Sequence, residues 1–402
     1  MVTKYTHQNY NFTDLLIFVI ILLSIKLYTL FIPYGATKFA VLLGEIIVLV
    51  FLAVHFVYDH SKRISMGYKW EITLIFFSLI LSTFAAEIFH NQGISKTLFA
   101  QYDFYFFLFY FLLHYLKPDP KKMLQMFLVL GYIYVLLYLI QYFLYPRIIV
   151  SSRVSAERGT IRIFIPGIQY MFTSYFILLG RFFQKKQIKY ILALIPIIVI
   201  VFLLGTRQLL SVIMLLTLLN ILFSKTVKSK VFMYILIASC IIPFYFAFEG
   251  IFNEILMTSQ QQFAEGATEN IRYKAAYYYL FNFNSNPLWM LVGNGAPGIN
   301  SDYGRQVMIL QEEYGYYQSD IGIIGEFFKF GIIFVIAQFV LLYKMLITKL
   351  PEEFKFIIYN VLSIFFTMLV GAGLHAATIG LLCFMMYFAD ISRHYSKTTA
   401  FK

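Results

Sequence analysis

Long apolar runs separated by short polar stretches dominate this chain. Runs long enough to cross a bilayer occur at about 13–33, 39–58, 70–89, 99–116, 123–145, 163–181, 189–205, 207–223, 231–249, 321–343, 355–371 and 374–391. A membrane-spanning helix needs roughly 20 such residues. Asp14 precedes the first run and no small-residue cleavage site follows it, so we expect a first span and not a signal peptide. The pattern predicts an all-α polytopic membrane protein with about twelve transmembrane helices.

Composition agrees with this fold class. Of the 402 residues, 60% are hydrophobic and 13% are charged, which is more apolar surface than one soluble core could bury. The net charge of +12 is spread over short loops between apolar runs, a pattern typical of membrane orientation and not of a nucleic-acid-binding face. Cys240 and Cys383 lie in separate apolar runs with no CxxC, so we expect buried, inert thiols.

The distribution of Lys and Arg predicts the orientation. Twelve spans place both termini on one side, and the loops of that side carry 20 Lys and Arg residues against 10 on the other side. Cytoplasmic loops carry the excess of positive charge, so the termini are predicted to be cytoplasmic. The chain then divides into spans 1–9 (1–249), a large extracytoplasmic loop before the tenth span (250–320), and spans 10–12 with a cytoplasmic tail (321–402).

Arginine is concentrated on the predicted outer side. Seven of the ten outer cations are Arg, whereas Lys predominates on the cytoplasmic side. Arg is preferred where a planar fork must hold phosphate or carboxylate. The outer loop 146–162 contains four arginines, and the loop 250–320 is too long to be a simple connector. An amphipathic helix is expected within the large loop at about 267–281.

Four outward-facing motifs, in this order, resemble the bacterial O-antigen polymerase and ligase superfamily. They lie between about residues 160 and 345. The motifs are Arg162-Ile-Phe-Ile-Pro-Gly167, the short turn Gly205-Thr-Arg207, Arg272 followed by Asn286-Pro287-Leu-Trp-Met-Leu-Val-Gly293-Asn-Gly295, and Asp320-Ile-Gly322-Ile-Ile-Gly325 with Gly331. Ligases of this superfamily usually carry a His at the last motif, where this chain has Ser319-Asp320, so the resemblance favours a polymerase.

The resemblance implies a GT-C-like membrane glycosyltransferase without a cofactor. Such a polymerase transfers a growing glycan from undecaprenyl diphosphate onto a new lipid-linked repeat unit at the outer face of the bacterial cytoplasmic (inner) membrane. Its partners would be the lipid-linked oligosaccharide, the bilayer, and flippase and chain-length regulator proteins. Two alternatives stay open: ligase-like transfer to a non-identical acceptor, and a flippase or transporter of the lipid-linked unit. Neither the capsule, exopolysaccharide or O-antigen type nor the sugars follow from the sequence.

This chemistry assigns roles to particular residues. A departing lipid diphosphate beside a low-dielectric bilayer needs fixed positive charge, for which we expect Arg207, Arg272 and Arg162, with Arg158 beside them. The acceptor hydroxyl needs a base, for which Asp320 is the leading candidate. Each residue also has a simpler interpretation. An interfacial Arg can extend its head group to water, and Asp is suited to cap the N-terminus of a helix.

Aromatic and histidine residues complete the set of candidates. Tyr278, Tyr317 and His375 could contact sugar rings, and His90 and His375 are the alternatives to Asp320 as base. Tyr residues at a membrane interface are equally expected as anchors, and an interfacial His is more often simply satisfied. The outer segments contain no HExxH, DxD or paired-carboxylate ligand set, so no metal is expected.

Overall fold

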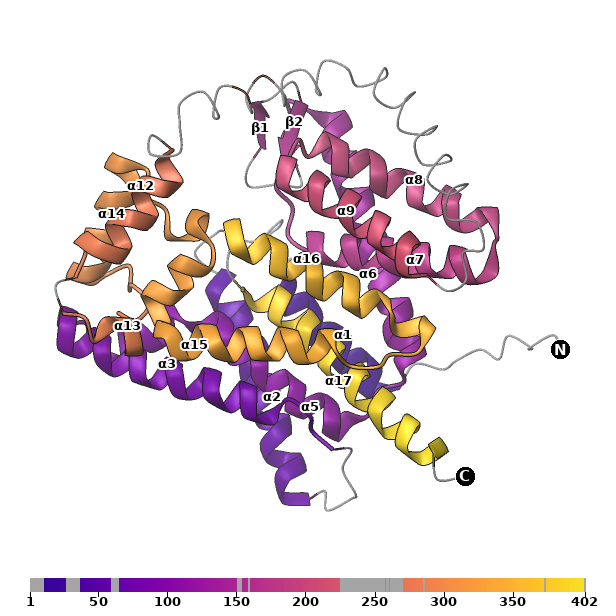
Figure 1. Cartoon of the computed structure of the whole chain (residues 1–402), viewed down its shortest axis with the longest axis horizontal. Helices are drawn as coiled ribbons and strands as arrows, with labels where there is room; N and C mark the ends of the chain where they lie inside the picture. Colours follow the sequence, from indigo (N-terminus) through magenta and orange to yellow (C-terminus); the bar gives the residue numbers. More distant parts are fainter. Residues whose placement is uncertain are drawn as a thin grey trace.

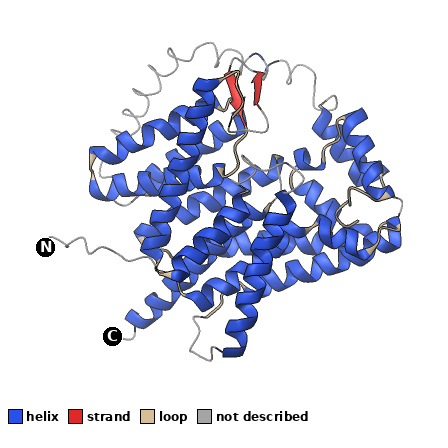
Figure 2. Cartoon of the chain, turned by 180° about the vertical axis from the view of Figure 1, so that it is seen from behind, coloured by secondary structure: helices blue, strands red, loops and turns tan. Residues whose placement is uncertain are grey.

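The chain folds into a bundle of helices (Figures 1 and 2). The computed structural model describes residues 11–26, 37–58, 65–149, 154–157, 160–224, 257, 260, 270–284, 286–371 and 374–400. The first half contains α1 (Phe12–Ile25), α2 (Thr37–Tyr58), α3 (Lys69–His90), α4 (Ile94–Ala100), η3 (Tyr102–Phe107), α5 (Leu108–Leu116), α6 (Pro120–Leu144), α7 (Ile168–Lys185), α8 (Ile188–Leu203) and α9 (Arg207–Phe223). The second half contains α12 (Ile271–Tyr277), η4 (Tyr278–Asn282), α13 (Trp289–Val292), α14 (Asp302–Tyr314), η5 (Gln318–Ile321), α15 (Ile323–Leu346), η6 (Glu352–Phe354), α16 (Phe356–Val370) and α17 (Ala376–Ala400).

Five of these helices are long and apolar enough to cross a membrane. They are α2, α3, α6, α15 and α17, and shorter apolar helices include α1, α8 and most of α9. The structure therefore supports a membrane-embedded all-α protein, while the number of twelve spans stays a prediction. The expected span 231–249 lies outside the described residues. The expected span 99–116 is divided into α4, η3 and α5, because the buried Gln101 amide donates to Thr83 Oγ1 of α3 (3.0 Å) and holds the chain between these turns.

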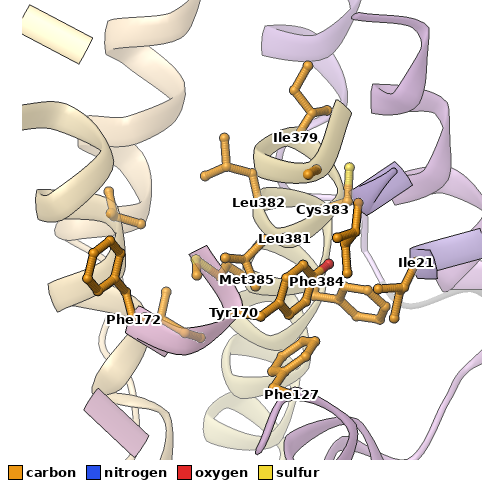
Figure 3. Packing of buried hydrophobic residues seen from close by; sticks show 14 of the residues in the cluster. Ile21, Phe127, Tyr170, Phe172, Ile379, Leu381, Leu382, Cys383, Phe384 and Met385 are labelled. Carbon is orange, nitrogen blue, oxygen red and sulfur yellow. The ribbon is translucent and has the colours of Figure 1, made fainter. Parts of the chain in front are cut away.

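Helix α17 forms the centre of the bundle. In its apolar window 89% of the residues are buried, against 22% for α2, so α2 exposes its apolar side chains at the periphery. Figure 3 shows side chains of α17 packed against Ile21, Phe127 and Tyr170 from three other helices. Cys383 is fully buried among them, as expected for an inert thiol. Cys240 lies outside the described residues.

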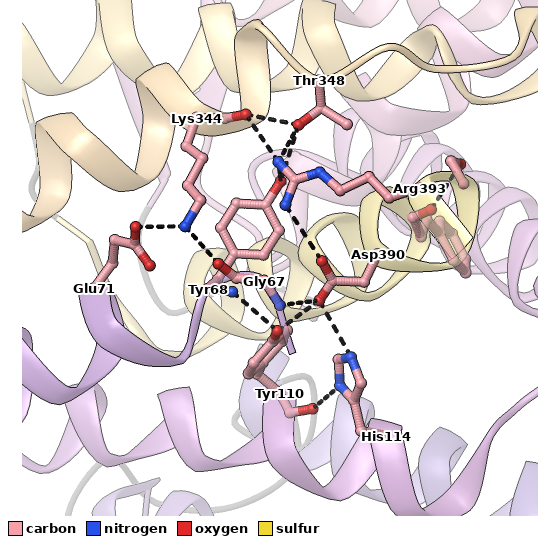
Figure 4. Close-up of polar contacts among 11 residues, drawn as sticks. Gly67, Tyr68, Glu71, Tyr110, His114, Lys344, Thr348, Asp390 and Arg393 are labelled. Carbon is pink, nitrogen blue, oxygen red and sulfur yellow. Dashed lines mark hydrogen bonds and ion pairs between the residues drawn. The ribbon is translucent and has the colours of Figure 1, made fainter. Parts of the chain in front are cut away.

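A hydrogen-bonded polar cluster joins several helices at one end of the bundle, here called the Asp390 end (Figure 4). The buried Asp390 carboxylate accepts hydrogen bonds from Tyr110 Oη (2.6 Å) and Gly67 N (3.0 Å), and lies 3.2 Å from His114 Nε2. Nearby, Lys344 Nζ donates to Glu71 Oε1 (2.8 Å). The cluster therefore gathers the start of α3 with the ends of α5, α15 and α17.

The opposite end of the bundle is here called the loop end. There α3 ends and α15 begins, beside the segment 286–304. Lys26, at the end of α1, donates to Tyr102 Oη (3.0 Å) and Asp103 Oδ1 (3.3 Å) just before α5. At the Asp390 end, Lys122 Nζ at the start of α6 donates to Asp14 Oδ2 at the start of α1 (2.7 Å). The helices thus alternate in direction as the topology predicts, whereas the side of the membrane that each end faces stays a prediction.

Replacing Asp390 with asparagine should destabilise the protein by about 3 kcal/mol, because an amide can neither accept from all these donors nor balance the charge of Arg393. Thermal unfolding of the purified protein measures the effect. Asp302→Asn is the matched control, since its ion pair with Arg305 is exposed and contributes little. Equal unfolding temperatures for the two variants would contradict a stabilising role for the cluster.

The loop 146–162, predicted to lie on the outer side, contains a feature that the all-helical prediction missed. Strand β1 (Val154–Glu157) pairs antiparallel with β2 (Thr160–Ile163), with Val154 opposite Ile163 and Ser155 opposite Arg162. Ile163 is fully buried and Val154 and Ile161 pack against the core. β-Branched residues alternate with polar ones here, which favours a strand with one face buried.

Candidate functional site

Helix α15 is broken near the loop end. At Gly331 the backbone takes φ 77° and ψ −179°, a conformation open essentially to glycine alone. The break leaves carbonyls of α15 without their usual helical donors, and other groups donate hydrogen bonds to them. Asn294 N donates to Phe328 O (3.0 Å), Gly295 N donates to Lys329 O (2.8 Å), and Ser78 Oγ of α3 donates to Phe330 O (2.7 Å). Such non-helical backbone is tolerated at membrane depth only where protein satisfies it.

The segment Gly293-Asn-Gly295 is therefore attached to α15 mainly by main-chain atoms. Gly293 also has a left-handed backbone (φ 81°, ψ 178°), and a Cβ there would lie 2.2 Å from Lys329 O. A Cβ on Gly331 would lie 2.3 Å from Leu291 O. The two glycines permit the close approach of α13 and α15, which accounts for their presence in two of the sequence motifs.

His90 and Tyr303 support this attachment. The His90 ring stacks on Tyr303 with centroids 4.1 Å apart, and His90 Nε2 lies 2.9 Å from Asn294 Oδ1. Tyr303 is 2% exposed and donates to Gly295 O (3.1 Å), and burial raises the pKa of its phenol well above the usual value. His90 is therefore packed as a structural residue, and the buried Tyr303 is not accessible to a glycan.

The other tyrosines divide between core and surface. Tyr279 is buried and donates to Tyr316 O (3.0 Å), and burial raises the pKa of its phenol. Tyr278 is half-buried, with its ring centroid 5.6 Å from that of Tyr316. Tyr317 is 44% exposed, as is most suitable for a sugar ring. Of the two tyrosines expected to contact glycan, Tyr317 is the more accessible.

Arg162 lies beside the turn that leads to Arg207. Its Nε donates to Leu204 O (3.4 Å), and its guanidinium lies 5.1 Å from the centre of the Phe164 ring. Leu204 is followed by Gly205, whose φ is +59°, and Arg207 is the first residue of α9. The side chains of Arg207 and Arg158 lie outside the described part of the structure.

The start of α9 is held against the end of α16. Gln208, the neighbour of Arg207, donates from Nε2 to Phe366 O and Thr367 O, both at 3.3 Å. The backbone that carries Arg207 therefore lies close to the loop between α16 and α17, in which His375 is exposed.

Asp320 and Arg272 lie on two elements that contact each other. Helix α12, which carries the exposed Arg272, packs against η5, which contains Asp320, and η5 contacts α16. Asp320 is exposed, 3.4 Å from Ser319 Oγ, and forms no ion pair within the described ranges. The N-cap of α15 is Gly322, so interpreting Asp320 as the cap of this helix is wrong.

Glu326 is a carboxylate near this region to which the sequence gave no catalytic role. It is 1% exposed, and Oε1 accepts from Leu374 N (2.6 Å), next to His375. Its Oε2 has no hydrogen-bond partner among the residues that the structure describes. Lys329, one turn further along α15, forms no ion pair with Glu326 in those ranges. A carboxylate within a predicted span was the available signal.

These contacts form a continuous path around the end of α16. Helix α12 contacts η5, η5 contacts α16, and α16 contacts α9. Arg162 then joins β2 to the turn before α9. Figure 1 shows the end of α16 between α12 and the β1–β2 hairpin. The structure brings Arg162 next to the backbone of Arg207 and Arg272 next to η5, whereas Arg272 and Arg162 lie on different sides of the site.

Comparisons with family models, curated proteins and solved structures found no match for this chain.

Proposed function

We propose that the chain is a membrane polysaccharide polymerase that transfers a growing glycan from undecaprenyl diphosphate to a new lipid-linked repeat unit. The observation that carries this proposal is the path of contacts that gathers α12, η5, the end of α16, the start of α9 and β2 at one end of the bundle. Three candidate cations and the candidate base all belong to these elements. A site at the end of membrane helices lets lipid tails stay in the bilayer while sugars stay in water.

The chemistry needs permanent positive charge around the leaving group. The attacking sugar hydroxyl forms a bond to the anomeric carbon, the bond from that carbon to the lipid diphosphate oxygen breaks, and the hydroxyl proton passes to a base. Guanidinium groups remain protonated throughout, so Arg162, Arg207 and Arg272 would stabilise the departing diphosphate. The exposed Asp320 carboxylate would accept the proton. The loop end is then extracytoplasmic and the Asp390 end cytoplasmic.

Two other activities are compatible with a membrane bundle. A ligase would transfer the finished glycan to a different acceptor, and a flippase would move the lipid-linked unit without chemistry. A conduit should carry charged side chains along a path across the membrane. The cation Lys26, at the end of α1, instead pairs with Asp103 at the loop end, with 3.3 Å between Lys26 Nζ and Asp103 Oδ1. This favours a one-sided enzyme.

The test is turnover by the purified protein of a synthetic undecaprenyl-diphosphate repeat unit. The polymerase should produce a ladder of products from this substrate alone. A ligase needs a second acceptor, and a flippase leaves the substrate intact but moves it across a vesicle membrane. Absence of a ladder, together with transport, would overturn the proposal.

Arg162→Gln should lower the rate of ladder formation by about 100-fold, because one fixed charge beside the diphosphate is lost. The Arg162 hydrogen bond to Leu204 O is replaceable by the glutamine amide, so the fold should remain. Arg305→Gln is the matched control, an exposed loop-end arginine whose partner is Asp302. If both variants lose activity equally, the effect is general surface charge and Arg162 has no specific role.

A further inference from the structure

A cavity of about 400 Å³ opens near the Asp390 end, away from the candidate active site. It lies between the start of α6, the end of α7, the start of α8, the end of α9 and the segment from η6 into α16. Its apolar lining includes Leu124, Phe176, Ile177 and Phe183. The cavity therefore extends between the ends of helices that the composition assigns to the membrane.

Two polar side chains within the cavity lack partners. Asn220 and Tyr359 both line it, and each is 94% buried, with 6% of its surface exposed. Neither the Asn220 amide nor the Tyr359 hydroxyl has a hydrogen-bond partner in the described ranges. Both can donate a hydrogen bond to an occupant of the cavity.

The cavity is also lined by an excess of positive charge. Lys355 is paired with Glu352 at 2.5 Å, so these two largely cancel. The remaining lining charges are the cations Lys121, Arg181 and Lys185 and the carboxylate Glu353. None of the three cations forms an ion pair with a residue that the structure describes. An anion entering the cavity would therefore meet both unpaired cations and unpaired hydrogen-bond donors.

We propose that this cavity binds a phosphate ester, presented as the head group of an anionic phospholipid. The phosphate would lie against Arg181 and Lys185 and accept from Asn220, while the apolar lining takes the first carbons of the acyl chains. Basic cavities between membrane helices on the cytoplasmic side suit such head groups, because the leaflet there is anionic. The site does not depend on the polymerase activity, and binding can be measured without turnover.

The experiment uses the full-length protein in a neutral detergent. Thermal unfolding is followed during titration with phosphatidylglycerol, with phosphatidylcholine, and with inorganic phosphate. We expect a saturable rise in unfolding temperature with phosphatidylglycerol and none with phosphatidylcholine. A similar rise with inorganic phosphate would show that the free anion suffices, and its absence would assign the site to the lipid.

Gly180→Leu tests whether the cavity itself is the site. A Cβ at Gly180 meets no atom within 4 Å, and Gly180 lines the cavity, so a leucine should fill it without a clash and without weakening α7. We expect binding to weaken at least about tenfold while the unliganded protein unfolds at its usual temperature. Unchanged binding in this variant would overturn the proposal.

The charge requirement is tested with paired substitutions. Arg181→Gln with Lys185→Gln should weaken phosphatidylglycerol binding about tenfold or more. Lys186→Gln with Lys189→Gln is the matched control, because these cations lie at the same helix ends but do not line the cavity. Equal weakening by both pairs would show a diffuse basic surface and would overturn the assignment to this cavity.

Discussion

Arg207→Ala should abolish chain growth while the protein reaches the membrane at its normal level. Removing a fixed charge that stabilises a developing anion costs about 100- to 1000-fold in rate. The turn that carries Arg207 is held by neighbouring groups instead, through Arg162 to Leu204 O and Gln208 to the end of α16. The fold should therefore survive the substitution. The measurement is ladder formation from a lipid-linked repeat unit, normalised to the amount of protein in the membrane.

Arg207→Lys separates geometry from charge. A lysine keeps the positive charge but loses the planar fork, so it should restore little activity if two diphosphate oxygens are held at once. Substantial activity in Arg207→Lys would mean that charge alone suffices. Normal chain growth by Arg207→Ala would contradict the proposed diphosphate site, whereas the membrane fold would be unaffected.

Gly331→Ala should destabilise the protein and detach the loop segment around Gly293 from α15. The backbone at Gly331 excludes a side chain at a cost of about 1–3 kcal/mol, and the added Cβ would lie 2.3 Å from Leu291 O. To avoid this clash, α15 must straighten. The carbonyls of Phe328 and Lys329 would then accept hydrogen bonds within the helix and would no longer accept from Asn294 N and Gly295 N. We expect a total cost of about 3–5 kcal/mol. Thermal unfolding and limited proteolysis within 293–300 measure the effect.

Gly180→Ala is the glycine control for this experiment. Its Cβ meets no atom within 4 Å and its backbone is helical, so alanine should leave stability unchanged or raise it slightly. Increased cleavage in 293–300 for Gly331→Ala alone would support the attachment described here. Identical stability and proteolysis for the two variants would show that the break in α15 is not needed.

The pattern of apolar runs predicts the positions of the long helices better than it predicts breaks within them or short strands between them. Apolar runs located α2, α3, α6 and α15 closely, because the bilayer imposes one length and one composition on every span. The break at Gly331 was not predicted, since a glycine within an apolar run is common and only the contact with α13 distinguishes this one. The β1–β2 hairpin was likewise missed, because its two strands are only four residues long, at the lower limit of the alternation that indicates a strand, and the second runs into a long apolar segment.

For the site residues, the sequence predicted which end of the helices they occupy and what chemistry they offer, but not which of them are buried. Arginines on one predicted side indicated anion chemistry, and the described elements that carry Arg162, Arg207 and Arg272 do lie at one end. Burial, however, depends on tertiary packing. Nothing in the sequence distinguished the buried Tyr303 from the exposed Tyr317, or indicated that Glu326 accepts a hydrogen bond from Leu374 N.

The junction between Gly293-Asn-Gly295 and α15 joins backbone to backbone, with Ser78 and the Asn294 amide as its side-chain contributions. Backbone amides and carbonyls are the same in every amino acid except proline. A foreign loop grafted onto this scaffold should therefore seat correctly if it supplies glycine at the positions of both Gly293 and Gly295, because a Cβ at Gly295 would lie 2.6 Å from Ala86 Cβ. Under the proposed function, loop exchange would be a practical way to give the same membrane scaffold a different sugar specificity.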